Sequence, residues 1–199
     1  MNNLIKNDNC LKCTLPIACT LAATTCCLVG IFLLVNTQYF LAFGFVLLAV
    51  WLDMMDGYFA RLLQQESVFG ATLDLLQDVL NYLVFPSLLF YQLGYQDGFN
   101  IALLFIFVMC GLLRLARFHA DGFLQKNHSI YYVGMPVYYN HLLVLIVLLA
   151  PTVMQPIVLS GLLLIASLLM VSSFPFKKPR NVLLWSIVLL SLSTYFLLV

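Results

Sequence analysis

Charged residues are scarce in this sequence. Only 9% of its 199 residues are Asp, Glu, Lys or Arg, whereas 63% are hydrophobic. A soluble globular domain has roughly a quarter of its residues charged and about half of them apolar, so the composition excludes that class. The net charge of +1 indicates no particular partner, and we expect no nucleic-acid partner.

Polar stretches that would separate domains are also absent. A membrane-spanning helix needs about 20 mostly apolar residues, and seven windows meet this requirement: 14–35, 38–60, 69–93, 98–118, 132–150, 155–173 and 181–199. The windows lack the alternation of apolar and polar residues that a membrane β-barrel requires. We therefore expect an all-α integral membrane protein with about seven transmembrane helices. The short connections indicate a single membrane-embedded domain over residues 1–199.

One set of connections between the windows contains no Lys or Arg. With seven spans the connections alternate between two sides, and those near 36–38, 94–97 and 151–154 hold no basic residue. All nine basic residues fall on the other side, which the positive-inside rule assigns to the cytoplasm. The sequence thus predicts a multi-pass protein of the cell (inner) membrane, with residues 1–13 as a cytoplasmic N-terminal segment.

A second cysteine pair is missing near the Cys10-x-x-Cys13 pair. Zinc and redox sites built on this spacing need further ligands or an oxidising setting, and cytosolic thiols remain reduced. The six cysteines are therefore interpreted mainly as small apolar packing residues.

Five of the eight acidic residues lie in residues 51–78 of this apolar chain, and four of these five are aspartates. Asp53 and Asp56 are three residues apart, and Asp74 and Asp78 are four apart, so each pair lies on one helix face. A short polar connection makes the two helices antiparallel neighbours, so the pairs can meet near the cytoplasmic membrane surface. Because carboxylates in membrane segments are costly and usually functional, we interpret the four as one site.

The residues around the aspartates favour phosphoryl-transfer chemistry. Clustered carboxylates repel one another unless cations intervene, and oxygen-rich sites suit Mg²⁺ or Mn²⁺. Two such ions can clamp the attacking and leaving oxygens of a phosphoryl displacement. Gly57 leaves room for a ligand, and Arg61 can bind phosphate through two donors. Taken singly, the glycine is equally typical of helix packing and the arginine of an interfacial charge.

The segment from Asp53 to Asp78 reads D-x2-D-G-x2-A-R-x8-G-x3-D-x3-D, and it resembles the signature of the CDP-alcohol phosphatidyltransferases. The resemblance implies a membrane enzyme with a six-helix core, typically a homodimer, that uses an alcohol to displace CMP from CDP-diacylglycerol. It implies two Mg²⁺ or Mn²⁺ ions per subunit held by Asp53, Asp56, Asp74 and Asp78, with Asp78 also as the general base. It further implies that the CDP-lipid contacts Gly57, Ala60, Arg61 and Gly70.

Three further stretches resemble bacterial phosphatidylserine synthases, which implies L-serine as the acceptor and phosphatidylserine as the product. They are "DVLNYLVFPSLLFY" at 78–91, "RLARF" at 114–118 and "LMVSSFPFKKP" at 169–179. The sequence departs from this branch at His119, where Asn is usual.

The stretch "GMPVYYNH" at 134–141 is a second departure, and it resembles phosphatidylcholine synthases. Its Tyr138 and Tyr139 can cage a quaternary ammonium or lie in an interfacial aromatic belt. Choline, glycerol phosphate and inositol phosphate therefore remain alternative acceptors.

Arg114 and Arg117 lie three residues apart near the cytoplasmic end of the fourth window. We predict that they bind phosphate or a substrate carboxylate. The alternative is that they extend to the lipid head groups.

Two other classes of protein are alternatives to a membrane transferase. A cation transporter can use intramembrane aspartates as an ion site, but it needs neither a cytidine pocket nor Arg61. An inactive membrane scaffold is expected to have lost at least one of the aspartates, and all four are present.

Overall fold

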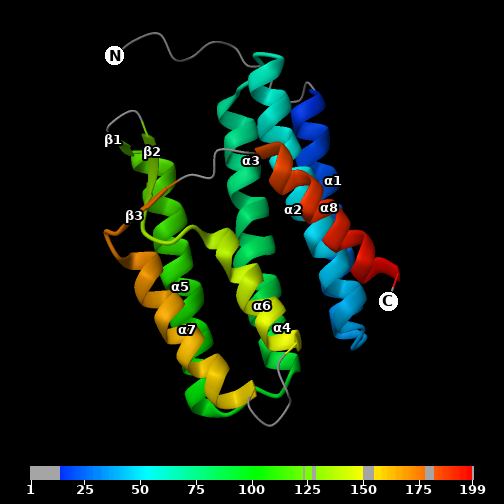
Figure 1. Cartoon of the computed structure of the whole chain (residues 1–199), viewed down its shortest axis with the longest axis vertical. Helices are drawn as coiled ribbons and strands as arrows, with labels where there is room; N and C mark the ends of the chain where they lie inside the picture. The colour runs from blue at the N-terminus through cyan, green and yellow to red at the C-terminus, as the bar shows by residue number, and fades with distance from the viewer. Residues whose placement is uncertain (1–13, 123, 127–128, 150–154, 178–181, 199) are drawn as a thin grey trace.

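The computed structural model describes residues 14–122, 124–126, 129–149, 155–177 and 182–198 (Figure 1). Three long helices are continuous: α1 (Leu15–Val35), α2 (Tyr39–Leu62) and α5 (Gly98–Asp121). A further long segment is composite, with α3 (Val68–Val79), a π-helix η1 (Leu80–Val84) and α4 (Phe85–Gln92). The remaining helices are a 3₁₀ turn η2 (Val137–Tyr139), α6 (Asn140–Leu149), α7 (Gln155–Val171) and α8 (Val182–Leu198).

These helices confirm the expected all-α membrane fold. Four segments are long and apolar enough to cross a membrane, namely Leu15–Val35, Tyr39–Leu62, Val68–Gln92 and Gly98–Asp121. Three shorter apolar helices in the described part of the chain fall in the last three predicted windows. The apolar run lengths therefore located each of these seven helical segments in the described part of the chain.

The fifth window, 132–150, was wrong at its beginning. Residues Ser129–Val133 form a strand, β2, which pairs antiparallel with β1 (Leu124–Lys126) and β3 (Pro175–Lys177). The chain turns after β2 at Gly134, whose φ is +74°, and a Cβ there would lie 2.5 Å from the main-chain oxygen of Met170. Pro136 follows two residues later and disfavours helical geometry at Met135, so the first helical turn begins only at residue 137.

The composite segment α3–η1–α4 bends at a proline. Pro86 has no N–H to donate to the carbonyl of Tyr82, four residues earlier, and the residues just before it are wound as a π-helix. Leu83 of this π-helix packs against Gly111 of α5, where an added Cβ would lie 2.2 Å from the leucine Cδ2. The missing side chain at Gly111 thus lets the bent segment approach α5 closely.

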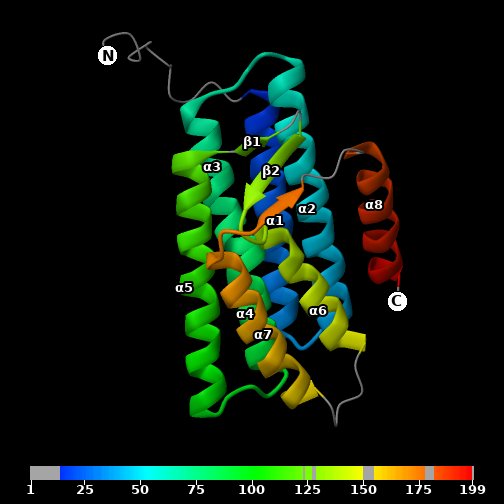
Figure 2. The ribbon, with the colours of Figure 1, turned by 60° about the vertical axis from the view of Figure 1, so that its left-hand side comes forward.

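The helices form an elongated bundle (Figures 1 and 2). α1 packs along α2, α5 packs along α7, and α8 lies on the outer side of α2. The α2–α3 connection and the small sheet lie toward one end, and the α4–α5 connection, the end of α6 and the start of α7 lie toward the other (Figure 1). This alternation agrees with the order of connections expected from the sequence.

Two helix starts are capped by side chains from the connections. Ser67 Oγ accepts a hydrogen bond from the N–H of Gly70 at 3.0 Å, at the start of α3. Asp97 caps α5 by accepting from the N–H of Asn100, and the hydrogen bonds from Asn100 hold the pKa of this exposed carboxyl below its usual value. Such caps satisfy N–H groups that have no partner within the helix.

Candidate active site

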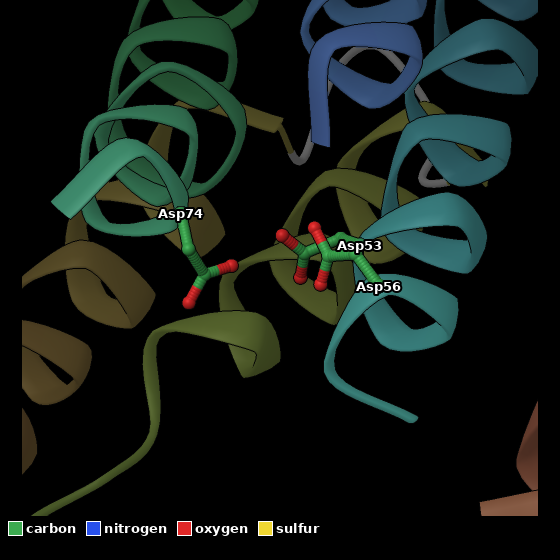
Figure 3. A group of neighbouring side chains, drawn as sticks. All are labelled: Asp53, Asp56 and Asp74. Atoms are coloured by element: carbon green, nitrogen blue, oxygen red, sulfur yellow. The ribbon is translucent and has the colours of Figure 1, made fainter. Parts of the chain in front are cut away.

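Three of the four motif aspartates converge between α2 and α3. Asp53 and Asp56 project from α2, and Asp74 faces them from α3 (Figure 3). Each side chain contributes one carboxylate oxygen to a group whose atoms all lie within 4.8 Å of one another. The i, i+3 spacing on α2 and the antiparallel course of α3 bring these carboxylates together, as the sequence predicted.

Hydrogen bonds orient two of these carboxylates, and neither donor was predicted. Thr20 of α1 donates its hydroxyl to Asp56 Oδ2 at 2.5 Å, with the carbonyl of Pro16 also within reach at 3.1 Å. The hydroxyl of Tyr82 donates to Asp53 Oδ2 at 3.2 Å. Tyr82 follows Asp78 by four residues, so the helical period was the available signal. No sequence pattern indicates the contact of Thr20.

The free oxygen of Asp53 indicates that the cluster can hold a metal ion. Asp53 Oδ1 is buried and has no hydrogen-bond partner among the described residues. Buried polar atoms are almost always paired, and three neighbouring carboxylates repel one another without a cation. Hard divalent ions bind such oxygen atoms. The donor set and the unpaired oxygen therefore fit Mg²⁺ or Mn²⁺ at Asp53, Asp56 and Asp74.

Asp78 lies one turn further along α3, outside the group of three oxygens. Its carboxylate interacts electrostatically with those of Asp53 and Asp74 and with the guanidinium of Arg114 from α5. It thus lies beside the cluster and opposite a cation. The four predicted metal ligands therefore separate into three gathered carboxylates and one neighbouring carboxylate that interacts electrostatically with an arginine.

A pocket of about 170 Å³ opens directly beside Asp56 and Asp74. All four positions expected to contact the CDP-lipid line it: Gly57, Ala60, Arg61 and Gly70. Residues at the start of α1 and in the α2–α3 connection complete its wall.

The two glycines of this pocket differ in what surrounds them. A Cβ on Gly57 would lie 3.6 Å from Arg61 Nη1, an ordinary contact, so the packing of the chain itself does not require glycine there. A Cβ on Gly70 would lie 3.1 Å from Ser67 Oγ, the cap of α3. Gly70 thus has a local structural role, whereas Gly57 leaves open space in the pocket.

The two arginines of α5 have different surroundings. Arg114 is 4% exposed, its Nε has no hydrogen-bond partner in the described part of the chain, and its guanidinium lies over the rings of Phe118 and Tyr132. Arg117 instead binds the end of α7, where its Nη2 donates to the carbonyl of Met170 at 2.9 Å. Of these two arginines, Arg114 is the one that interacts electrostatically with a motif aspartate, Asp78.

Arg117 makes two more bonds at the same helix end, to the carbonyls of Val171 and Ser172. Its guanidinium therefore caps carbonyls that have no partner within the helix. The two arginines predicted to bind substrate thus have different contacts in the structure.

Tyr138 and Tyr139 lie next to each other, with ring centroids 4.7 Å apart and the ring planes 34° from parallel. Tyr138 also contacts Tyr132, and Tyr139 contacts Phe176, so the pair belongs to an aromatic cluster under the sheet. The rings pack on neighbouring aromatic residues, and these contacts account for their placement.

Comparison with known proteins identifies the class of this site. Residues 13–193 match the CDP-alcohol phosphatidyltransferase family, so the chain belongs to that family of membrane enzymes. The match covers all the helices that carry the site.

Several curated relatives are named CDP-diacylglycerol–serine O-phosphatidyltransferase. The Helicobacter pylori (strain J99) protein is 32% identical over 181 residues, which cover 85% of this chain and 76% of that protein. The Methanocaldococcus jannaschii protein is 32% identical over 140 residues, covering 70% and 65%. The Saccharomyces cerevisiae protein is 38% identical over 98 residues, covering 47% and 36%. The chain thus spans about a third of the yeast relative and about two thirds of the archaeal one.

Proposed function

We propose that this protein transfers the phosphatidyl group of CDP-diacylglycerol to L-serine, which yields phosphatidylserine and CMP. The observation that carries the proposal is the meeting of Asp56 and Asp74 with Gly57, Ala60 and Arg61 around one pocket. A carboxylate cluster beside a phosphate-binding arginine provides what pyrophosphate cleavage requires. The names of the relatives support serine as the acceptor.

The reaction is a displacement at the phosphorus that carries the diacylglycerol. The serine hydroxyl oxygen forms the new bond to this phosphorus, and the bond to the bridging oxygen breaks so that CMP leaves with that oxygen. Asp78 accepts the hydroxyl proton, because it lies beside the cluster and outside its three gathered oxygens. A carboxylate placed in this way can serve as general base.

Arg114 and Arg61 divide the recognition of the two substrates. Arg114 is buried opposite Asp78 and has an unpaired Nε, so it holds the serine carboxylate near the base. Arg61 lines the pocket and binds the pyrophosphate. Charge-assisted bonds of this kind are about twice as strong as neutral ones.

Two Mg²⁺ or Mn²⁺ ions per subunit would be held by Asp53, Asp56 and Asp74, with Asp78 beside them. When bound, the ions would neutralise the pyrophosphate and stabilise CMP as it leaves. Thr20 and Tyr82 would keep two of the carboxylates oriented for this purpose.

The protein is further proposed to act as a homodimer in the cell (inner) membrane, among lipids that include its substrate. The basic residues are expected on the same side of the membrane as the aspartates. By the positive-inside rule the active site would therefore face the cytoplasm.

Head-group selection is the direct test. Purified protein is supplied with CDP-diacylglycerol and Mn²⁺ or Mg²⁺, each alcohol is offered separately, and CMP and the lipid product are measured. Serine-dependent CMP release that yields phosphatidylserine is expected, and the Asp56→Asn variant is the inactive control. Turnover of choline, glycerol phosphate or inositol phosphate but not of serine would overturn serine as the acceptor. Absence of CMP release with every alcohol would overturn the transferase activity.

A cation transporter is the rival from another class. Ion transport alone gives no role to the open space at Gly57 or to Arg61 in the pocket wall. Metal-dependent ion flux into sealed vesicles without CMP release would favour the transporter.

A further inference from the structure

Tyr82 connects the aspartate cluster to the interior of the bundle through three contacts. Its hydroxyl donates to Asp53 Oδ2 at 3.2 Å, and its main-chain oxygen accepts from Asn140 Nδ2 of α6 at 2.9 Å. Its ring lies against the ring of His141, with centroids 5.0 Å apart. Tyr82 is 5% exposed and Asn140 is fully buried. Both ends of Tyr82 are thus held inside the protein.

The contact with Asn140 compensates for a defect in the helix. Pro86 has no N–H for the carbonyl of Tyr82, and a carbonyl left unpaired at this depth in a membrane is costly. The amide of Asn140 supplies a donor from a different helix. This bond also holds the main chain from which the Tyr82 side chain projects.

We propose that Tyr82 and Asn140 are positioning residues for the metal ligand Asp53. This inference rests on the metal site of the proposed function. Tyr82 binds Oδ2 of Asp53 and leaves Oδ1, which is buried and has no partner among the described residues, as the atom that would bind a metal ion. Asn140 acts one step further away, by holding the main chain of Tyr82. Partners of this kind behind a metal ligand typically contribute ten- to a hundredfold in metal affinity.

A role in packing alone predicts a different outcome. Removal of the Tyr82 hydroxyl leaves the aromatic ring and its contact with His141 in place. If Tyr82 had only a structural role, this change would leave the metal affinity almost unaltered, and any effect would appear in thermal stability. If Tyr82 positions Asp53, the protein would lose metal affinity even where its thermal stability is unchanged.

The test measures binding of Mn²⁺ alone to the purified full chain, from the electron paramagnetic resonance signal of the free ion. Tyr82→Phe is expected to weaken Mn²⁺ binding about tenfold or more. Tyr95→Phe is the matched control, because Tyr95 is also a buried tyrosine, 3% exposed, with a hydroxyl unpaired in the described structure. Equal Mn²⁺ affinity in Tyr82→Phe and Tyr95→Phe would overturn the proposal.

Asn140→Leu tests the second part of the proposal, the role of Asn140. It is expected to weaken Mn²⁺ binding severalfold on its own, yet to add nothing in the Tyr82→Phe background, because it acts through the tyrosine hydroxyl. Ser193→Ala is its control, since Ser193 also donates from a buried side chain to a carbonyl, that of Gly44 at 2.9 Å. Additive losses in the double variant would show that Asn140 does not act through Tyr82.

The wild type separates this inference from the proposed function. If wild-type protein binds Mn²⁺ and releases CMP while Tyr82→Phe binds Mn²⁺ equally well, only the positioning role is overturned. If wild-type protein binds no Mn²⁺, the metal site and the positioning role are overturned together.

Discussion

Thr20 of α1 and Asp56 of α2 are joined by a hydrogen bond of 2.5 Å between two buried side chains. The bond brings the first helix of the bundle into direct contact with the carboxylate cluster. The Thr20 hydroxyl also has the carbonyl of Pro16 within reach. The hydroxyl therefore has an alternative acceptor, whereas Asp56 would lose a donor if Thr20 were replaced.

Thr20→Val is expected to raise the Mn²⁺ concentration for half-maximal CMP release about tenfold or more, because Asp56 loses its orienting donor. Titration of activity with Mn²⁺ measures this change. Thr25→Val is the control, since Thr25 donates only to the carbonyl of Leu21 on its own helix and is exposed. Matching Mn²⁺ curves for the two variants would mean that Thr20 only packs.

Asp53→Asn, Asp56→Asn and Asp74→Asn are each expected to lower CMP release about a hundredfold or more, because each removes one charged ligand from the cluster. CMP is measured at saturating substrate and metal. Asp97→Asn is the control, because Asp97 caps α5 and asparagine caps helices equally well. Full turnover by any of the three variants would contradict the metal-binding role of that residue.

Gly57→Ala is expected to raise the KM for CDP-diacylglycerol about tenfold by filling pocket space. The fold should tolerate the change, because the added Cβ would meet only the Arg61 guanidinium at 3.6 Å. Gly161→Ala of α7 is the matched control, because nothing lies within 4 Å of a Cβ at that position. An unchanged KM in Gly57→Ala would mean that the lipid does not approach this face of α2.

Arg114→Ala and Arg117→Ala are expected to fail in different ways. Arg114→Ala should raise the KM for serine about ten- to a hundredfold, because a charge-assisted contact is lost. Arg117→Ala should lower the free energy of unfolding by about 1–3 kcal/mol, because three carbonyls at the end of α7 lose their donor.

Serine kinetics and thermal unfolding of both variants check this division. A serine KM raised equally in Arg117→Ala would show that both arginines bind the acceptor. Loss of CDP-diacylglycerol hydrolysis by water in Arg114→Ala would instead place Arg114 on the CDP-lipid phosphate.

Membrane orientation can be read from cysteine labelling in a background without the six native cysteines. An impermeant thiol reagent should label Gln96→Cys from outside the cell and Asp121→Cys only after the membrane is opened. The two positions precede and end α5, a helix long and apolar enough to cross the membrane. The reverse pattern would place the aspartates on the outer face.

The helices could be predicted because their determinants are local. Each apolar run must satisfy its backbone hydrogen bonds within itself when it lies in lipid, so run length alone indicates a helix. The aspartate cluster could be predicted for a related reason. The spacing of Asp53 and Asp56 fixes one helix face, and the short connection to α3 brings Asp74 opposite them.

The three-stranded sheet could not be predicted in this way. β2 pairs with β3, which lies more than forty residues further along the chain, and the apolar residues Tyr132 and Val133 were predicted to begin a membrane helix. Only the return of α7 to the same end of the bundle provides β2 with its partner. Long-range strand pairing depends on where the helices place the chain, and no local pattern records it.

The sequence by itself determined the membrane class, the helices and the chemistry of the carboxylates, because these follow from composition and from spacing along single helices. The tertiary structure decided which side chains serve that chemistry. Arg114 and Arg117 are three residues apart and chemically identical, yet one lies opposite Asp78 and the other caps α7. Thr20 and Tyr82 reach the cluster only because α1 and the bent segment at Pro86 pack beside α2. These contacts join residues 29 or more positions apart, and packing of the whole bundle is what creates them.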